Sequence, residues 1–164
     1  MKKYLMKKKV NMPTQKSIDL LLLSTTSPLM CGIYEDLELK ESKNYECKTL
    51  DALTDILSSL AQIKINRIFY SRGPGSFTAI KLTHLFVQTL SIVKNIDLYS
   101  TDAFYFNANT PIKAFGNQYF FKEGEEIVLK TLQQAQLQKF VLPQKIHEED
   151  FSKNNEPLYV LPPV

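Results

Sequence analysis

Apolar runs alternate with polar turns along most of the chain, and the first runs have the character of strands. Ile18 to Thr25 is an almost continuous apolar run, which is typical of a central strand that is covered on both faces. Strands are also predicted over Leu29 to Tyr34 and Leu37 to Ser42, joined by an acidic turn. Two shorter strands are predicted over Arg67 to Ser71 and Ile96 to Ser100.

Two segments between these strands have helical periodicity. Leu50 to Ile63 carries apolar residues at spacings of three and four, so an amphipathic helix is predicted there. Phe77 to Val93 is apolar around most of its circumference. A helix that packs on one sheet needs only a single apolar stripe. The surplus predicts a second surface to bury, either under another layer of this chain or against another subunit.

The pattern after Thr101 predicts a smaller, separate set of elements. Ile112 to Phe115 and Gln118 to Lys122 are expected to pair as a hairpin across Gly116 and Asn117. A helix is predicted over Glu125 to Phe140, although its apolar spacing is imperfect. The remaining polar tail is expected to wrap the surface. By local pattern alone, the chain is an α/β protein with a mixed sheet.

The segment RGPGSFT, from Arg72 to Thr78, lies between a predicted strand and a predicted helix. Proline fixes one φ, and Gly73 and Gly75 are expected to take φ values that a side chain would forbid. Ser76 is placed to cap the helix. A glycine-rich turn before a helix can bind an anion, but the residues of a P-loop, a nucleophile elbow or a dinucleotide fingerprint are missing. Local features leave open a ligand-holding turn and a turn that only packs a helix onto a sheet.

Three segments of the chain resemble the TsaB (YeaZ) family, which is needed for the bacterial threonylcarbamoyladenosine modification of tRNA. They are RGPGSFT, the first strand and its turn from Leu23 to Leu29, and Pro157 to Pro163. The resemblance extends from about Ser17 to Ala103. It implies an actin-like ATPase (ribonuclease H-like) core, with a mixed five-stranded sheet and flanking helices, and a reduced second subdomain. The expected divisions are a disordered basic leader (1–16), the ribonuclease H-like N-terminal domain (17–103), and a reduced C-terminal subdomain and tail (104–164).

The sequence also departs from the family pattern. Ser24 stands where the family commonly has an Asp at the end of the first strand. Tyr45, Glu46 and Cys47 replace a His-Ser-Glu sequence that often precedes the first helix. After the heptad, a usual Gly and a usual Arg are replaced, and a further small residue is Thr; these positions are Ala79, Lys81 and Thr83.

The resemblance implies a non-catalytic subunit that binds and supports the related enzyme TsaD in threonylcarbamoyl transfer to adenosine 37 of tRNA (t6A formation). ATP and a metal ion are then expected on partner subunits, with TsaE as a further partner and tRNA contacted only indirectly. The alternatives are an ATP-dependent enzyme of the actin-like class, a hydrolase that uses Ser76 or Cys31, or a degenerate relative that acts as a homodimer. Catalysis of phosphoryl transfer needs carboxylates that hold Mg²⁺, and the first predicted strand ends in hydroxyl residues.

Two groups of residues follow from this hypothesis. The turn is expected to set the direction of the second helix so that its apolar face meets TsaD. The turn residues are Arg72, Gly73, Pro74, Gly75 and Ser76, and the expected partner interface is Leu53, Leu57, Leu60, Phe77, Ile80, His84, Leu85 and Val87.

Composition narrows the remaining choices. The chain has 164 residues, a net charge of +3, two cysteines and two histidines. Much of the positive charge lies in the leader, so a broad basic face for direct tRNA binding is not indicated. Two cysteines are too few for a disulfide scaffold or a metal site. The apolar runs are too short to span a bilayer, and a cytoplasmic protein with reduced thiols is expected.

Overall fold

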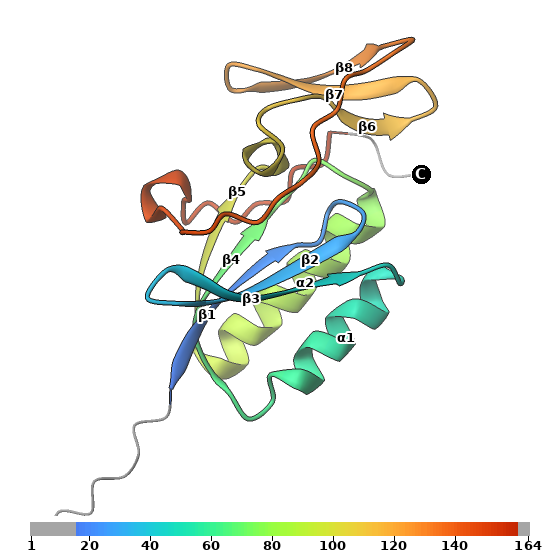
Figure 1. Ribbon diagram of the computed structural model, residues 1–164. Coiled ribbons are helices and arrows are strands. Elements are labelled where there is room, and N and C mark those ends of the chain that lie inside the picture. The colour runs from blue at the N-terminus through green and yellow to red at the C-terminus, as the bar shows by residue number, and fades with distance from the viewer. Residues whose placement is uncertain (1–15, 161–164) are drawn as a thin grey trace, which may run out of the picture.

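The computed structural model describes residues 16–160 and contains a five-stranded mixed sheet (Figure 1). The strands lie in the order β3-β2-β1-β4-β5, with β2 antiparallel to both neighbours and β4 and β5 parallel to β1. This confirms the α/β class and the five-stranded mixed sheet. The predicted leader lies almost entirely outside the described residues, as do the last residues of the tail. The strands are β1 (Ser17–Leu23), β2 (Leu29–Glu35), β3 (Glu38–Tyr45), β4 (Lys64–Ser71) and β5 (Asp97–Thr101).

Two helices cover one face of this sheet, α1 (Thr49–Ser59) and α2 (Phe77–Lys94) (Figure 1). Alternate residues of β1, among them Leu20 and Leu22, belong to the same buried cluster as residues of both helices. The helix α2 begins where predicted, and it ends at Asn95 in the left-handed conformation. The helix α1 ends before the predicted Ile63, because the chain turns there to enter β4. Among the described residues, no helix has the length and apolar character that crossing a membrane requires.

The opposite face of the sheet is covered mainly by the irregular chain after residue 131, which we call the coil (Figure 1). Leu142, Ile146 and Phe151 are buried in one cluster with Leu21 and Leu23 of β1. Within this covering coil, the 3₁₀ turn η2 (Glu148–Asp150) is a short regular element. Side chains from this coil therefore serve as the second layer of the core.

A smaller three-stranded antiparallel sheet follows β5 and the 3₁₀ turn η1 (Ala103–Phe106). The hairpin across Gly116 and Asn117 is confirmed, and Gly116 has a positive φ of 54° that suits the turn. The strands are β6 (Ile112–Phe115), β7 (Gln118–Glu123) and β8 (Glu126–Thr131).

The predicted helix over Glu125 to Phe140 is wrong. Its first part is β8, which pairs with β7 along its length, and residues 132–143 contain no helix. Ile127 and Leu129 alternate along β8 and pack beside Phe120 in a third buried cluster. Strand periodicity over six residues thus outweighed the weak helical spacing of the longer window.

One ion pair between a buried and a half-buried residue lies on the face of the sheet that the coil covers. Asp19 of β1 is 4% exposed, and Arg67 of β4 donates to it from Nε at 2.9 Å and from Nη2 at 2.6 Å. The hydrogen bond to Asp19 raises the pKa of the Arg67 guanidinium. Arg67 Nη1 also donates to Glu148 in η2. The pair therefore links β1, β4 and the covering coil.

We expect the substitution Asp19→Ala to lower the free energy of unfolding by about 2 kcal/mol, because it removes the acceptor of two charge-assisted hydrogen bonds and leaves the half-buried Arg67 guanidinium with Glu148 alone. Urea unfolding followed by circular dichroism measures this loss. The matched control is Glu38→Ala, which removes the exposed pair between Lys40 and Glu38 and should cost below about 1 kcal/mol. An equal, small loss for both variants would contradict the structural role of the pair between Asp19 and Arg67.

Candidate functional site

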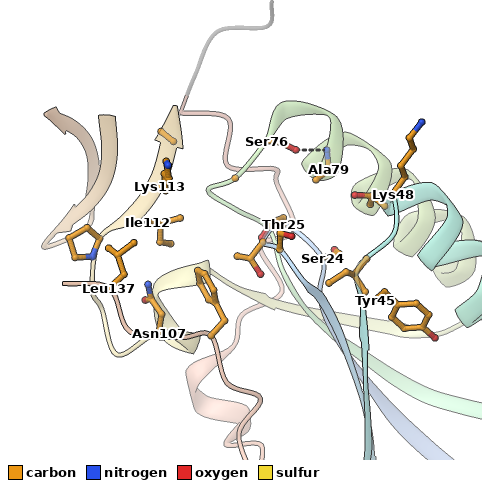
Figure 2. Close-up of a pocket in the computed structure, with 18 of the residues that line it drawn as sticks. Ser24, Thr25, Tyr45, Lys48, Ser76, Ala79, Asn107, Ile112, Lys113 and Leu137 are labelled. Carbon is orange, nitrogen blue, oxygen red and sulfur yellow. Dashed lines mark hydrogen bonds between the residues drawn. The ribbon is translucent and has the colours of Figure 1, made fainter. Parts of the chain in front are cut away.

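A cleft of about 580 Å³ lies between the end of the large sheet and the small sheet (Figure 2). One wall is formed by the turn that follows β1, the start of α1 and the turn before α2. The other wall is formed by Asn107 directly after η1, by β6, and by the coil after β8. Residues from five separate parts of the chain meet here, and the principal ones are Ser24, Thr25, Lys48, Ser76, Asn107, Ile112, Lys113 and Leu137.

Two hydroxyl groups at the end of β1 are held by neighbouring elements. Ser24 Oγ lies 2.5 Å from Thr83 Oγ1 of α2, and Thr25 Oγ1 lies 3.0 Å from Ser71 Oγ of β4. Both pairs are buried. These hydroxyls therefore join the end of β1 to α2 and to β4 at this wall of the cleft.

The turn before α2 packs its backbone directly against the end of β1. A Cβ atom at Gly75 would lie 2.1 Å from the Thr25 carbonyl oxygen, so only glycine fits there. The expectation that Gly75 needs a positive φ is wrong, since only Gly73 of this turn has one, at 123°. Ser76 caps α2 as predicted: its Oγ accepts a hydrogen bond from the Ala79 amide at 3.1 Å.

The same turn also holds a C-terminal segment, residues 151–160. The Leu158 amide donates to the Arg72 carbonyl at 2.9 Å, and Arg72 Nη1 donates to the Glu156 carbonyl at 3.1 Å. A Cβ at Gly73 would lie 2.9 Å from the Leu158 carbonyl oxygen. The glycines thus permit close contacts on two sides, with β1 and with the C-terminal segment.

The eight predicted interface residues fall into three groups. Leu57 and Leu85 are exposed. Phe77 and His84 are half-buried, and the Phe77 ring contacts Tyr159 of the C-terminal segment at a centroid distance of 4.9 Å. The other four are buried within this chain: Leu53, Leu60, Ile80 and Val87. Those four are core residues of this chain and are not available on its surface.

Two exposed apolar residues of these helices were not predicted, Leu50 of α1 and Ile92 of α2, and Ile92 lies near the predicted Leu85. Leu85 of α2 is 54% exposed and Ile92 is 81% exposed. They lie seven residues apart, which places them on one face of the helix. This spacing was visible in the sequence, but the helix is apolar on nearly every side, so the pattern did not separate the core face from the outer face. Asn107 of the cleft was also missed, since it lies in an irregular turn that has no periodic signal.

The two cysteines lie in different surroundings. Cys31 is buried in the sheet, and burial, together with the charge of Glu41, raises the pKa of its thiol to about 12. Cys47 is exposed and lines the cleft. Within residues 16–160, no group of three or more histidine, cysteine and acidic side chains is arranged to hold an ion.

Comparison with known proteins identifies a similar fold. No protein-family model matches the chain, and no curated protein is significantly similar in sequence. The structure of YeaZ from Pseudomonas aeruginosa matches with a TM-score of 0.51 and 18% identity, over 74% of this chain and 63% of that chain. An uncharacterized Pseudomonas aeruginosa protein, described as similar to the peptidase YEAZ, matches with a TM-score of 0.48, 17% identity, and coverage of 74% and 62%.

The first match shows that this chain has a YeaZ-like α/β fold. This chain spans less than two thirds of the length of that structure. The fold class predicted from the sequence is therefore confirmed, and membership of the TsaB family remains a hypothesis at this level of identity.

We expect Gly75→Ala to destabilise the protein by about 3 kcal/mol, because the added methyl group would displace the turn from the Thr25 carbonyl. Gly116→Ala is the matched control. A Cβ at Gly116 meets no atom within 4 Å, so that variant should cost only about 1 kcal/mol for its positive φ. Urea unfolding measures both. An equal cost at the two sites would show that the turn yields to the extra methyl group.

At pH 8, iodoacetamide should modify Cys47 and leave Cys31 intact, because the raised pKa keeps the Cys31 thiol protonated at that pH and burial blocks its access. Peptide mass spectrometry after timed labelling measures both sites. In urea above the unfolding transition, both cysteines should react. Rapid labelling of Cys31 in the folded protein would contradict its placement in the core.

Proposed function

We propose that this chain is a non-catalytic subunit that binds TsaD and supports threonylcarbamoyl transfer to tRNA, as the TsaB resemblance implies. TsaE is a further expected partner. The observation that carries the proposal is the outward-facing apolar pair Leu85 and Ile92 on α2. Large side chains that are exposed at one face of an otherwise well-packed helix are typical of a protein interface.

The neighbouring helix α1 also carries exposed apolar residues. Leu50 and Leu57 of α1 are exposed, and they also lie seven residues apart, two turns along the same face of that helix. The YeaZ-like fold supports the proposal further, because it places the two helices together on one side of the sheet (Figure 1). The helix surface, defined here as Leu50, Leu57, Leu85 and Ile92, is therefore our candidate contact with TsaD.

Phe77 and His84 are half-buried, so only part of each side chain is available to a partner. Phe77 already contacts Tyr159, so a partner would meet it together with the C-terminal segment. Phe86, next to Leu85, packs against the helix-side core and should act on stability more than on pairing. The polar substitutions that test the interface therefore belong at Leu85 and Ile92.

We expect the double substitution Leu85→Ser and Ile92→Ser to weaken co-purification with TsaD by at least about tenfold, which corresponds to about 1.4 kcal/mol. The melting temperature should change by only a few degrees, since both side chains are exposed. Pull-down from a co-expressed pair, with TsaD from the same source, measures the first quantity, and thermal unfolding measures the second.

The matched control is Val141→Ser, an exposed apolar residue in the coil after β8. It should leave pairing unchanged. Reconstituted tRNA threonylcarbamoylation with and without this chain provides the functional test. Unchanged pairing in the double variant would remove the helix surface from the proposal. ATP turnover by the isolated chain at enzyme-like rates would favour the alternative, an actin-like enzyme. A change from dimer to monomer in light scattering would assign the helix surface to self-association.

A further inference from the structure

Both walls of the cleft contain a buried polar atom that has no hydrogen-bond partner among residues 16–160. Asn107 is 2% exposed. Its Nδ2 donates to the Thr110 carbonyl at 3.0 Å, whereas its Oδ1 accepts from no described group. In the turn after β1, Thr26 Oγ1 is buried without a partner as well. Leaving such groups unpaired costs free energy, so a ligand that pairs with them would gain affinity.

Two helices begin at the wall opposite Asn107 (Figure 2). The first backbone amides of a helix have no partner inside the helix, and they carry the positive end of its dipole. At α1, Lys48 stands at the N-cap position and makes no side-chain cap. At α2, Ser76 caps the amide of Ala79. The remaining amides of both first turns favour an anion at this wall.

The charges in the lining agree with an anionic ligand. The lining includes Lys48 and Lys113 and, within the described chain, no aspartate or glutamate. Lys48 lies at the rim beside α1, and Lys113 lies on β6 in the opposite wall (Figure 2). Mg²⁺ requires oxygen ligands, usually including a carboxylate, so the lining suits an anion that arrives without a metal ion.

We propose that this cleft binds a small phosphate monoester that carries hydroxyl groups, without a divalent cation. The phosphate lies at the N-termini of α1 and α2, and Lys113 contributes positive charge from across the cleft. A ligand hydroxyl donates to Asn107 Oδ1, and Thr26 Oγ1 donates to a ligand oxygen. The volume of about 580 Å³ is within the usual range for small-molecule sites.

This inference does not rest on the proposed pairing with TsaD. The residues of the helix surface, Leu50, Leu57, Leu85 and Ile92, do not line the cleft. Ligand binding can therefore be measured on the isolated full chain, and loss of one property leaves the other unaffected.

The test is calorimetric titration of the full chain with ribose 5-phosphate, ribose and inorganic phosphate, each in the presence of EDTA. Ribose 5-phosphate should bind at least about tenfold more tightly than either simpler probe, since it pairs with both walls. Added Mg²⁺ should not strengthen binding. The overturning results are an absence of ribose 5-phosphate binding at millimolar concentration, affinity no better than that of inorganic phosphate, or a requirement for Mg²⁺.

Two variants locate the site. Lys113→Glu should weaken ribose 5-phosphate binding about tenfold or more, while the control Lys40→Glu on the exposed strand β3 should leave it unchanged. Asn107→Leu should abolish the preference for ribose 5-phosphate over inorganic phosphate. If Asn107→Leu does not fold, the comparison at the exposed residue Lys113 tests the proposal by itself. Equal affinities of Lys113→Glu and Lys40→Glu for ribose 5-phosphate would overturn the proposal.

Discussion

The structure depends on covering both faces of its central strand. Leu20, Leu21, Leu22 and Leu23 of β1 are fully buried, so each face of the strand needs its own apolar layer. Two helices provide one layer. The other layer comes from side chains in the coil after β8, fixed to the sheet by Arg67 and Glu148. An irregular segment can serve in this way because its backbone bonds to the exposed edges of the sheet, as where Ser152 and Ser100 exchange amide hydrogen bonds.

Much of the large sheet could be predicted from the sequence, because its elements have strong local signals. The continuous apolar run of β1 and the helical period of α1 each have a distinct pattern, and in the small sheet so does the hairpin turn at Gly116 and Asn117. The coil layer has no such signal. Leu142, Ile146 and Phe151 follow no helix or strand period, and their role depends entirely on contacts with distant residues. The segment beginning at Glu126 was misassigned for a related reason, since pairing with β7 decided its conformation.

The candidate site shows the same division. The turn from Arg72 to Ser76 was recognisable in the sequence, but its main structural reason was not. Gly75 is required by contact with Thr25, and Gly73 by contact with Leu158, and both partners are far away in sequence. Asn107 reaches the cleft only because η1 brings it opposite the ends of the helices. Helical periodicity likewise could not separate Val87, which is buried, from Leu85, which is exposed.

The coil layer affects how the protein can fold during its synthesis on the ribosome. The last strand of the large sheet ends at Thr101, whereas the apolar layer over its second face is complete only at Phe151. During synthesis, the apolar second face of the large sheet therefore stays exposed to solvent until the small sheet and the coil have been synthesised. In that interval, chaperones can bind the exposed apolar face of the sheet. Slow translation would prolong the exposure of that face.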